Sequence, residues 1–146
     1  MVTPHLSNKE PEKPGVDLLP FTEEHMHDDY VRWLNDPNVT LYSRQKNRTH
    51  TYETCREFIR SFDTIRSHIW MIVANGQHIG NITYSNFDLA IMIGRREYWN
   101  KGYGTAAIKL AYNWLRSEGR EVSMGTKNPA MRRVMKKVGY ADCAGL

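Results

Sequence analysis

Residues 91–107 read IMIGRREYWNKGYGTAA, an apolar strand-like run that leads through a glycine-spaced turn into a helix. The first N–H groups of a helix have no intrahelical partner and carry the positive end of the helix dipole. Glycines let the backbone approach a ligand closely. The stretch therefore predicts an anion-binding cradle of main-chain donors, to which a lysine adds positive charge. The cradle comprises Asn100, Lys101, Gly102, Tyr103, Gly104 and Thr105.

The rest of the sequence alternates between strand-like and helix-like periods. Short apolar runs predict strands over 16–19, 69–73, 79–84, 89–93 and 121–124. Amphipathic periods predict helices over 22–34, 51–67, 103–118 and 128–138. Asn75-Gly76 is a strong hairpin signal between two of the strands. The order β-α-α-β-β-β-α-β-α indicates an α+β fold, in which a mixed, mostly antiparallel sheet is flanked by helices.

The length and composition indicate one globular domain. The chain has 146 residues, of which 40% are apolar and 25% are charged, and these fractions are typical of folded proteins. We expect the domain to span residues 16–146. Residues 1–15 contain several prolines and no apolar stretch, so we expect them to form a flexible tail.

The charge and the cysteines exclude several classes of protein. A net charge of +4 suits an anionic ligand but lacks the clustered runs of a nucleic-acid-binding arm. Cys55 and Cys143 have neither metal-ligand spacing nor a disulfide pattern. No apolar run is long enough to span a bilayer, and the N-terminus has no apolar signal region. We therefore expect a cytoplasmic protein with no metal, no nucleic-acid partner and no membrane attachment.

Two other interpretations of the glycine turn stay open at this point. Paired glycines are common in tight turns that bind nothing. Gly102-x-Gly104-x-x-Ala107 also fits a relaxed dinucleotide-binding pattern. That pattern normally follows the first strand of its fold directly, whereas this turn follows the fourth predicted strand after a loop. A nucleotide-triphosphate loop is excluded because the turn has no Gly-Lys-Ser/Thr.

The same stretch resembles motif A of the GNAT superfamily of N-acetyltransferases, which is written Gln/Arg-x-x-Gly-x-Gly/Ala. Trp99 stands in the place of the Gln or Arg. Residues 128–140, NPAMRRVMKKVGY, are similar to the family's Asn-x-x-Ser/Ala…Lys-x-Gly-Phe helix. Residues 30–39, YVRWLNDPNV, are similar to the first helix of the branch that contains the ribosomal-protein alanine N-acetyltransferases. Together these stretches cover roughly residues 16–140 in the family's order.

The resemblance implies acetyl-CoA as co-substrate and a primary amine as acceptor, either a protein N-terminus or a small-molecule or amino-sugar amine. The amine attacks the thioester directly in a ternary complex. The pantetheine arm lies along the fourth strand at Ile91, Met92 and Ile93, while the pyrophosphate sits on residues 100–105. Asn128 matches a family asparagine that reaches the cofactor arm. A CoA-binding module of the same fold without catalysis is the alternative.

Asp88 is the candidate general base, because it aligns with a carboxylate of that branch and can accept the proton of the amine. An ordinary turn aspartate is the alternative. His50 and His68 are also titratable, but we expect them to be surface or strand-edge histidines. Met135 stands where many relatives carry a proton-donating tyrosine. We expect this methionine to pack in the core, and we assign no general acid.

The C-terminal part of the sequence is short for this family. Six residues follow Tyr140, so we expect a shortened C-terminal end of the fold. The resulting open acceptor pocket leaves room for a homodimer, in which a second subunit completes it.

Overall fold

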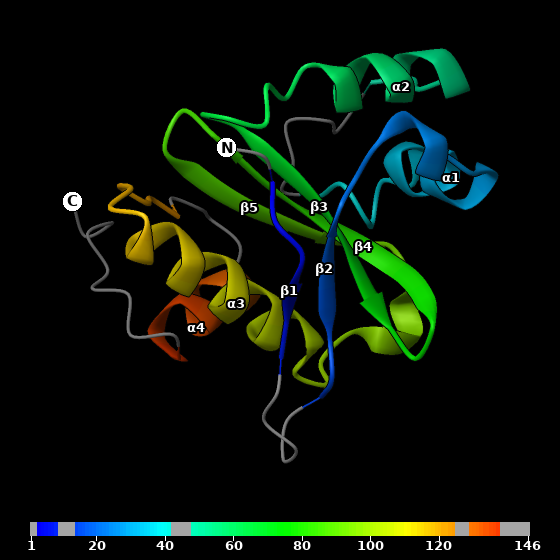
Figure 1. The fold of residues 1–146 in the computed structure, drawn as a ribbon. Helices are drawn as coiled ribbons and strands as arrows, with labels where there is room; N and C mark the ends of the chain where they lie inside the picture. Colours follow the sequence, from blue (N-terminus) through cyan, green and yellow to red (C-terminus); the bar gives the residue numbers. More distant parts are fainter. Residues whose placement is uncertain (1–2, 9–13, 42–47, 125–128, 138–146) are drawn as a thin grey trace.

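The computed structural model describes residues 3–8, 14–41, 48–124 and 129–137, and a five-stranded antiparallel sheet lies at its centre (Figure 1). The strands are adjacent in sequence order: β1 (Leu6–Ser7), β2 (Asp17–Pro20), β3 (His68–Ala74), β4 (Gln77–Ser85) and β5 (Asp88–Ile93). The α-helices are α1 (Asp28–Asn35), α2 (Tyr52–Arg60), α3 (Tyr103–Ser117) and α4 (Pro129–Lys137). Two 3-10 helices are η1 (Glu23–His25) and η2 (Arg96–Tyr98). The expected α+β architecture is confirmed.

Tight turns set the register of the central strands. Asn75 and Gly76 both have positive φ, as a two-residue hairpin between β3 and β4 requires. Residues 86–87 have the same property between β4 and β5. The resulting register places Ile82 of β4 opposite Ile91 of β5. Alternate side chains of each strand therefore face the same layer of helices.

Each face of the sheet has its own hydrophobic cluster. On the side of α3 and α4, Leu89 of β5 is buried in one cluster with Ala107 and Ile108 of α3. On the side of α1 and α2, Met92 of β5 is buried in a second cluster with Trp33 of α1. The helices cover opposite sides of the sheet (Figure 1). β5 contributes to both clusters and thereby links the two layers.

The N-terminal segment differs from the flexible tail that we expected over residues 1–15. β1 pairs with β2 and packs against the larger cluster through Leu6. Thr3 is buried, and its hydroxyl lies 2.7 Å from Nδ1 of His68. The indole N–H of Trp70 donates to the carbonyl of Pro4 at 2.8 Å. These contacts tie the segment to β3, which the proline-containing composition did not reveal.

Two of the expected helices are shorter in the structure than the segments whose helical pattern predicted them. The period over 22–34 is divided between η1 and α1, because His27 between them has extended backbone angles. α2 ends at Arg60, seven residues before the expected end. The carboxylate of Asp63 accepts main-chain hydrogen bonds from residues 65–67. A side-chain acceptor therefore closes a loop where the periodicity predicted further helical turns.

The strand expected over residues 121–124 is reduced to one point of pairing. Ser123 forms an isolated parallel bridge with Asp88 of β5. The path from β5 through α3 to Ser123 is the β-α-β crossover that the sequence predicted. Because regular pairing does not continue within residues 121–124, the described part of this segment leaves most of the adjacent edge of β5 uncovered.

Gly94 provides a test of how tightly α1 packs on the sheet. A Cβ at this position would overlap the ring of Trp33. We expect Gly94→Ala to lower the free energy of unfolding by about 1–3 kcal/mol, because overpacking forces side chains off their rotamers. Urea unfolding measures this. A Cβ at Gly15 meets nothing within 4 Å, so Gly15→Ala is the matched control and should leave stability unchanged. Equal stabilities of the two variants would contradict the packing described here.

Candidate functional site

β5 and the chain at Ser123 are joined at one point and then separate. The N–H of Leu89 donates to the carbonyl of Ser123 at 2.8 Å. The N–H of Ser123 donates in turn to the carbonyl of Phe87 at 2.7 Å. No other described residue pairs its main chain with this edge of β5. Within the described residues, the edge is therefore open from Ser123 toward the C-terminal end of the strand.

The direction of each peptide group along this edge follows from the antiparallel ladder, in which successive residues alternate between facing the partner strand and facing away. Leu89 faces away from β4, because its N–H bonds outside the ladder. Gly94 faces β4, to which its N–H donates. Ile91 and Ile93 therefore present their main chain to the open edge, whereas the main chain of Met92 faces β4.

This alternation narrows the predicted contacts of a cofactor arm. Of the three residues that we expected to hold the arm, Ile91 and Ile93 have the required main-chain direction, and Met92 does not. The side chain of Met92 is buried under α1 and α2. The carbonyl of Ile93 already has a partner, because Nε1 of Trp99 donates to it at 2.9 Å.

The turn before α3 has the geometry of an anion cradle. Asn100 and Gly102 have φ values of 59° and 87°, a region that Asn and Gly tolerate best. The first intrahelical bond runs from the N–H of Ala106 to the carbonyl of Gly102. The N–H groups of residues 103–105 therefore have no intrahelical acceptor. They lie at the positive end of a helix of 15 residues, which favours a negatively charged ligand.

The cradle lies beside the open edge and beside the N-terminal hairpin. A Cβ on Gly104 would lie 3.7 Å from Cδ1 of Ile91. A Cβ on Gly102 would lie 3.4 Å from Cγ of Pro14. The side-chain amide of Asn8 donates to the carbonyl of Pro14 at 3.0 Å and fixes this proline. The free N–H groups of the helix and the open strand edge are thus neighbours, with the hairpin on one side.

Asp88 lies at the start of β5, where the edge is still joined to Ser123. The hydroxyl of Ser123 donates to Oδ1 of Asp88 at 3.5 Å. Because side chains alternate along a strand, Asp88 shares the α1–α2 side of the sheet with Ala90 and Met92. Met92 is buried there, but Ala90 is exposed and Asp88 is half-buried. The carboxylate therefore borders a part of this face that the helices leave accessible.

The other titratable candidates are buried, which corrects the expectation of surface or strand-edge histidines. His68 is fully buried and stacks on Trp70, and its burial lowers its pKa to about 4. His50 is also buried, and its main-chain N–H donates to the side-chain oxygen of Asn35. Neither histidine lies on the accessible face beside Asp88.

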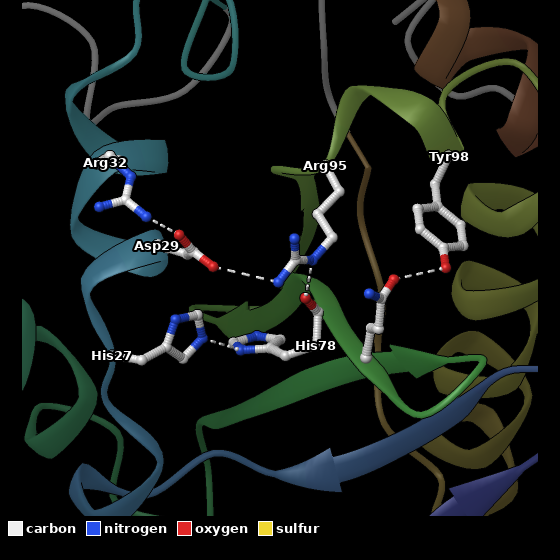
Figure 2. Close-up of polar contacts among 7 residues, drawn as sticks. His27, Asp29, Arg32, His78, Arg95 and Tyr98 are labelled. Carbon is white, nitrogen blue, oxygen red and sulfur yellow. Dashed lines mark hydrogen bonds and ion pairs between the residues drawn. The ribbon is translucent and has the colours of Figure 1, made fainter.

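A network of histidines and charges joins α1 to β4 and to the loop after β5 (Figure 2). Nε2 of His27 lies 2.8 Å from Nδ1 of His78, and Nε2 of His78 lies 2.8 Å from the carbonyl of Gly80. A carbonyl can only accept, so Nε2 of His78 carries the proton and Nδ1 accepts from His27. Arg95 donates to the carbonyl of His78 at 2.9 Å and pairs with Asp29 at 3.2 Å.

The arginines of the loop after β5 therefore bind the protein itself. Arg95 is held by the network of Figure 2. Arg96 pairs with Asp36 at 2.8 Å and lies over the ring of Trp99. Their ion pairs to α1 and to the turn after it make them supports of the loop.

Several other predicted residues have a plain outcome. Met135 is 2% exposed and lies in the larger cluster, so its expected packing in the core is confirmed. Asn128 lies outside the described residues. Ser123 lies in a segment that was expected as a strand, but its pairing with the start of β5 has no local signal. Pro14 was missed because it lies in the supposed tail.

Comparison with known proteins identifies the family of this chain. The sequence model of the acetyltransferase (GNAT) domain family matches residues 16–141. This chain belongs to the GNAT acetyltransferase family. A search of the curated proteins finds no match.

Solved structures share the GNAT fold with this chain at low sequence identity. One is RimL, a ribosomal L7/L12 α-N-protein acetyltransferase in complex with CoA, with a TM-score of 0.73 at 9% identity. The match covers 84% of this chain and 78% of the RimL chain. The microcin C7 self-immunity acetyltransferase MccE, in complex with acetyl-CoA and AMP, has a TM-score of 0.71 at 13% identity. The match covers 90% of this chain and 79% of the MccE chain. The aminoglycoside acetyltransferase AAC(6′)-Ib, in complex with CoA and kanamycin, has a TM-score of 0.65 at 15% identity. The match covers 85% of this chain and 83% of the AAC(6′)-Ib chain. The expected GNAT-like fold is confirmed, and RimL is consistent with the expected branch.

Two features are absent from the residues that the structure describes in the GNAT domain. No helix there is both long and apolar enough to cross a membrane. No group of three or more His, Cys, Asp or Glu side chains in the same residues could hold a metal ion.

The histidine network predicts a pH dependence of stability. Burial, followed by the neighbouring His27, lowers the pKa of His78 to about 3, and burial, followed by Arg95, also lowers the pKa of His27. The unfolded chain protonates its histidines near pH 6.5, whereas the folded chain resists protonation until lower pH. The free energy of unfolding should therefore fall between about pH 6.5 and pH 3, by up to about 1.4 kcal/mol per pH unit for His78.

Urea unfolding at a series of pH values tests this dependence. His78→Gln should flatten the slope in that pH range, because it removes one group that folding holds neutral. An unchanged slope in His78→Gln would contradict the protonation states assigned here.

Proposed function

We propose that this GNAT domain is an N-acetyltransferase that moves the acetyl group of acetyl-CoA to a primary amine. The observation that carries the proposal is the adjacency of the open edge at Ile91 and Ile93 to the N–H groups of residues 103–105. An open strand edge can bind an extended arm that contains amides. Free N–H groups at the start of a helix can bind a pyrophosphate. RimL and MccE contain CoA and acetyl-CoA in their structures, which supports the same co-substrate here.

The chain offers a suitable group for each part of CoA. An extended arm can bind an open strand edge as an added strand, through main-chain hydrogen bonds. Ile91 would provide both an N–H and a carbonyl, and Ile93 would provide an N–H. The pyrophosphate would meet the N–H groups of residues 103–105, with the exposed Lys101 beside them. Asn128 remains a predicted contact of the arm.

The proposed chemistry depends mainly on positioning and on one proton acceptor. Acetyl-CoA would supply an activated acyl group, and correct orientation of the two substrates can account for several kcal/mol of catalysis. A free amine is mostly protonated near neutral pH. Asp88 borders the accessible face at the point where β5 and Ser123 separate, and its carboxylate would take the proton of the amine.

The acceptor is proposed only as a class, a primary amine. Among the similar structures, RimL is described as an acetyltransferase of ribosomal L7/L12, and AAC(6′)-Ib is in complex with kanamycin. A protein N-terminus and a small-molecule amine are both compatible with the accessible face at Asp88 and Ala90. A panel of amines therefore forms part of the test.

A CoA-binding module without catalysis is a second candidate, and one observation favours it. The resemblance places a proton-donating tyrosine of many relatives at Met135, and here that side chain is 2% exposed in the core. A buried thioether cannot donate a proton to a leaving thiolate. In the proposed enzyme, water would provide this proton. The non-catalytic candidate predicts CoA binding without thiol release from acetyl-CoA.

Calorimetric titration with acetyl-CoA is the first experiment, and thiol detection with a panel of peptide, polyamine, aminoglycoside and amino-sugar amines is the second. Binding with amine-dependent thiol release supports the acetyltransferase. Binding without release from any amine supports the non-catalytic module. No binding at millimolar acetyl-CoA would contradict both.

The cradle can be tested with two glycines of similar backbone geometry. Gly102 has φ 87° and lies before α3, whereas Gly76 has φ 73° in the β3–β4 hairpin. Gly102→Asp places a carboxylate among the anion-binding donors, so we expect it to weaken CoA binding at least roughly tenfold in calorimetry. Gly76→Asp introduces similar backbone strain away from the cradle and should bind CoA like the wild type. Equal losses in both variants would show that strain, not charge, is responsible.

The role of Asp88 can be tested in the same assays. Asp88→Asn keeps the shape of the side chain but removes its basicity, so kcat/KM with a reactive amine should fall by about 10²–10⁴-fold while the Kd for CoA is unchanged. Asp88→Glu should retain much of the activity. Full activity in Asp88→Asn would exclude Asp88 as the base.

A further inference from the structure

Trp99 makes a contact that the family motif does not explain. It stands where the motif has Gln or Arg, and its indole N–H donates to the carbonyl of Ile93, the last residue of β5, at 2.9 Å. The ring is half-buried, and the guanidinium of Arg96 lies 5.7 Å from its centre. Arg96 is itself fixed by its ion pair with Asp36. The indole is therefore held in place from the α1 side of the loop.

This contact closes the second end of the open edge. At the first end, the N–H of Leu89 is bonded to Ser123. At the other end, the carbonyl of Ile93 is bonded to Trp99. Between the two ends, the carbonyl of Leu89, both groups of Ile91 and the N–H of Ile93 face outward, and no described residue bonds to them. The edge thus offers two acceptors and two donors in alternating order.

The pantetheine arm of CoA has two amide groups, and each carries one donor and one acceptor. A segment with two acceptors and two donors is the complement of such an arm. A ladder repeats its hydrogen-bond pattern every two residues, about 6.6 Å along a strand. With the carbonyl of Ile93 open, the arm could also bind one repeat closer to the cradle. The thioester would then move away from Asp88 by the same distance.

We infer that Trp99 is a positioning residue for the cofactor arm: its indole occupies the carbonyl of Ile93, aligns the end of β5 and fixes the register in which the arm binds. This inference rests on the proposed function. The indole also holds Ile93 extended, which aims the N–H of that residue at the open edge before the ligand arrives. Such preorganisation reduces the ordering that binding requires.

Trp99→Phe tests the inference, because it keeps an aromatic ring and removes the N–H. Two probes separate the arm from the cradle: CoA, and adenosine 3′,5′-bisphosphate, which lacks the pantetheine arm. We expect the Kd for CoA to increase roughly three- to tenfold, the effect of about one net hydrogen bond. The Kd for the bisphosphate should change less than about twofold, because that ligand does not use the edge. Trp114→Phe is the matched control, since Trp114 is a half-buried tryptophan of α3 in contact with Trp70, and it should change neither Kd.

Each other outcome overturns the inference. An equal loss for both probes would mean that Trp99 supports the loop and cradle in general. No loss for CoA would mean that the indole N–H is irrelevant to the arm. Failure of the wild-type protein to bind CoA would contradict the proposed function itself, and the inference with it. Wild-type binding with either of the first two results leaves the proposed function intact.

A measurement on the wild-type protein keeps the test valid if Trp99→Phe does not fold. The exchange rate of the Trp99 indole proton with solvent can be followed by NMR without and with CoA. If the indole N–H stays hydrogen-bonded to the carbonyl of Ile93 when CoA binds, this proton exchanges slowly in both states. If the arm takes that carbonyl instead, exchange becomes faster on addition of CoA, and the inference is wrong.

Discussion

Two main-chain hydrogen bonds between Ser123 and the start of β5 are the contact on which the site depends. They close the crossover through α3 with one bridge, and the described residues up to Met124 form no regular strand there. Continued pairing would satisfy the main chain of Ile91 and Ile93 within the protein and leave no edge for a ligand. An edge with unpaired peptide groups normally favours unwanted association with other chains. Here it lies beside the first turn of α3, where an anionic ligand can bind at the same time.

β5 separates the two sides of the proposed reaction because its side chains alternate between two layers. Leu89 and Ile91 pack toward α3, and Asp88 and Ala90 face the side of α1 and α2. A cofactor arm on the edge of this strand would therefore lie next to the carboxylate at its start. The ion pairs of Arg95 and Arg96 hold α1 and the loop after β5 in a fixed relation. The loop that forms the cradle is thus anchored to the α1 side of the sheet.

Local sequence signals predicted most of the fold and the position of the cradle. Asn75-Gly76 marked a hairpin, the apolar run at 89–93 marked a strand, and Gly102 and Gly104 marked the turn before α3. These features succeed because a few residues decide the backbone angles. The ends of helices were less predictable, since α2 is stopped by the carboxylate of Asp63 and not by its periodicity.

The remaining parts of the site depend on contacts between distant residues. Thr3 and Pro4 join the N-terminal segment to β3 across more than 60 positions, so composition alone suggested a tail. The direction of each peptide group on β5 requires the pairing register, which excludes the main chain of Met92 from the open edge. The indole bond of Trp99 to Ile93 needs the path of the loop after β5. None of these features has a periodic or compositional signal.

Amide hydrogen exchange of β5, measured by NMR without and with CoA, tests the central claim most directly. We predict that CoA slows the exchange of the N–H groups of Ile91 and Ile93. Leu89 and Met92 should show slow exchange in both states, because their N–H groups are already bonded to Ser123 and to β4. Protection confined to residues 103–105 would show that CoA binds the cradle alone. That result would contradict the proposal that the open edge of β5 holds the cofactor arm.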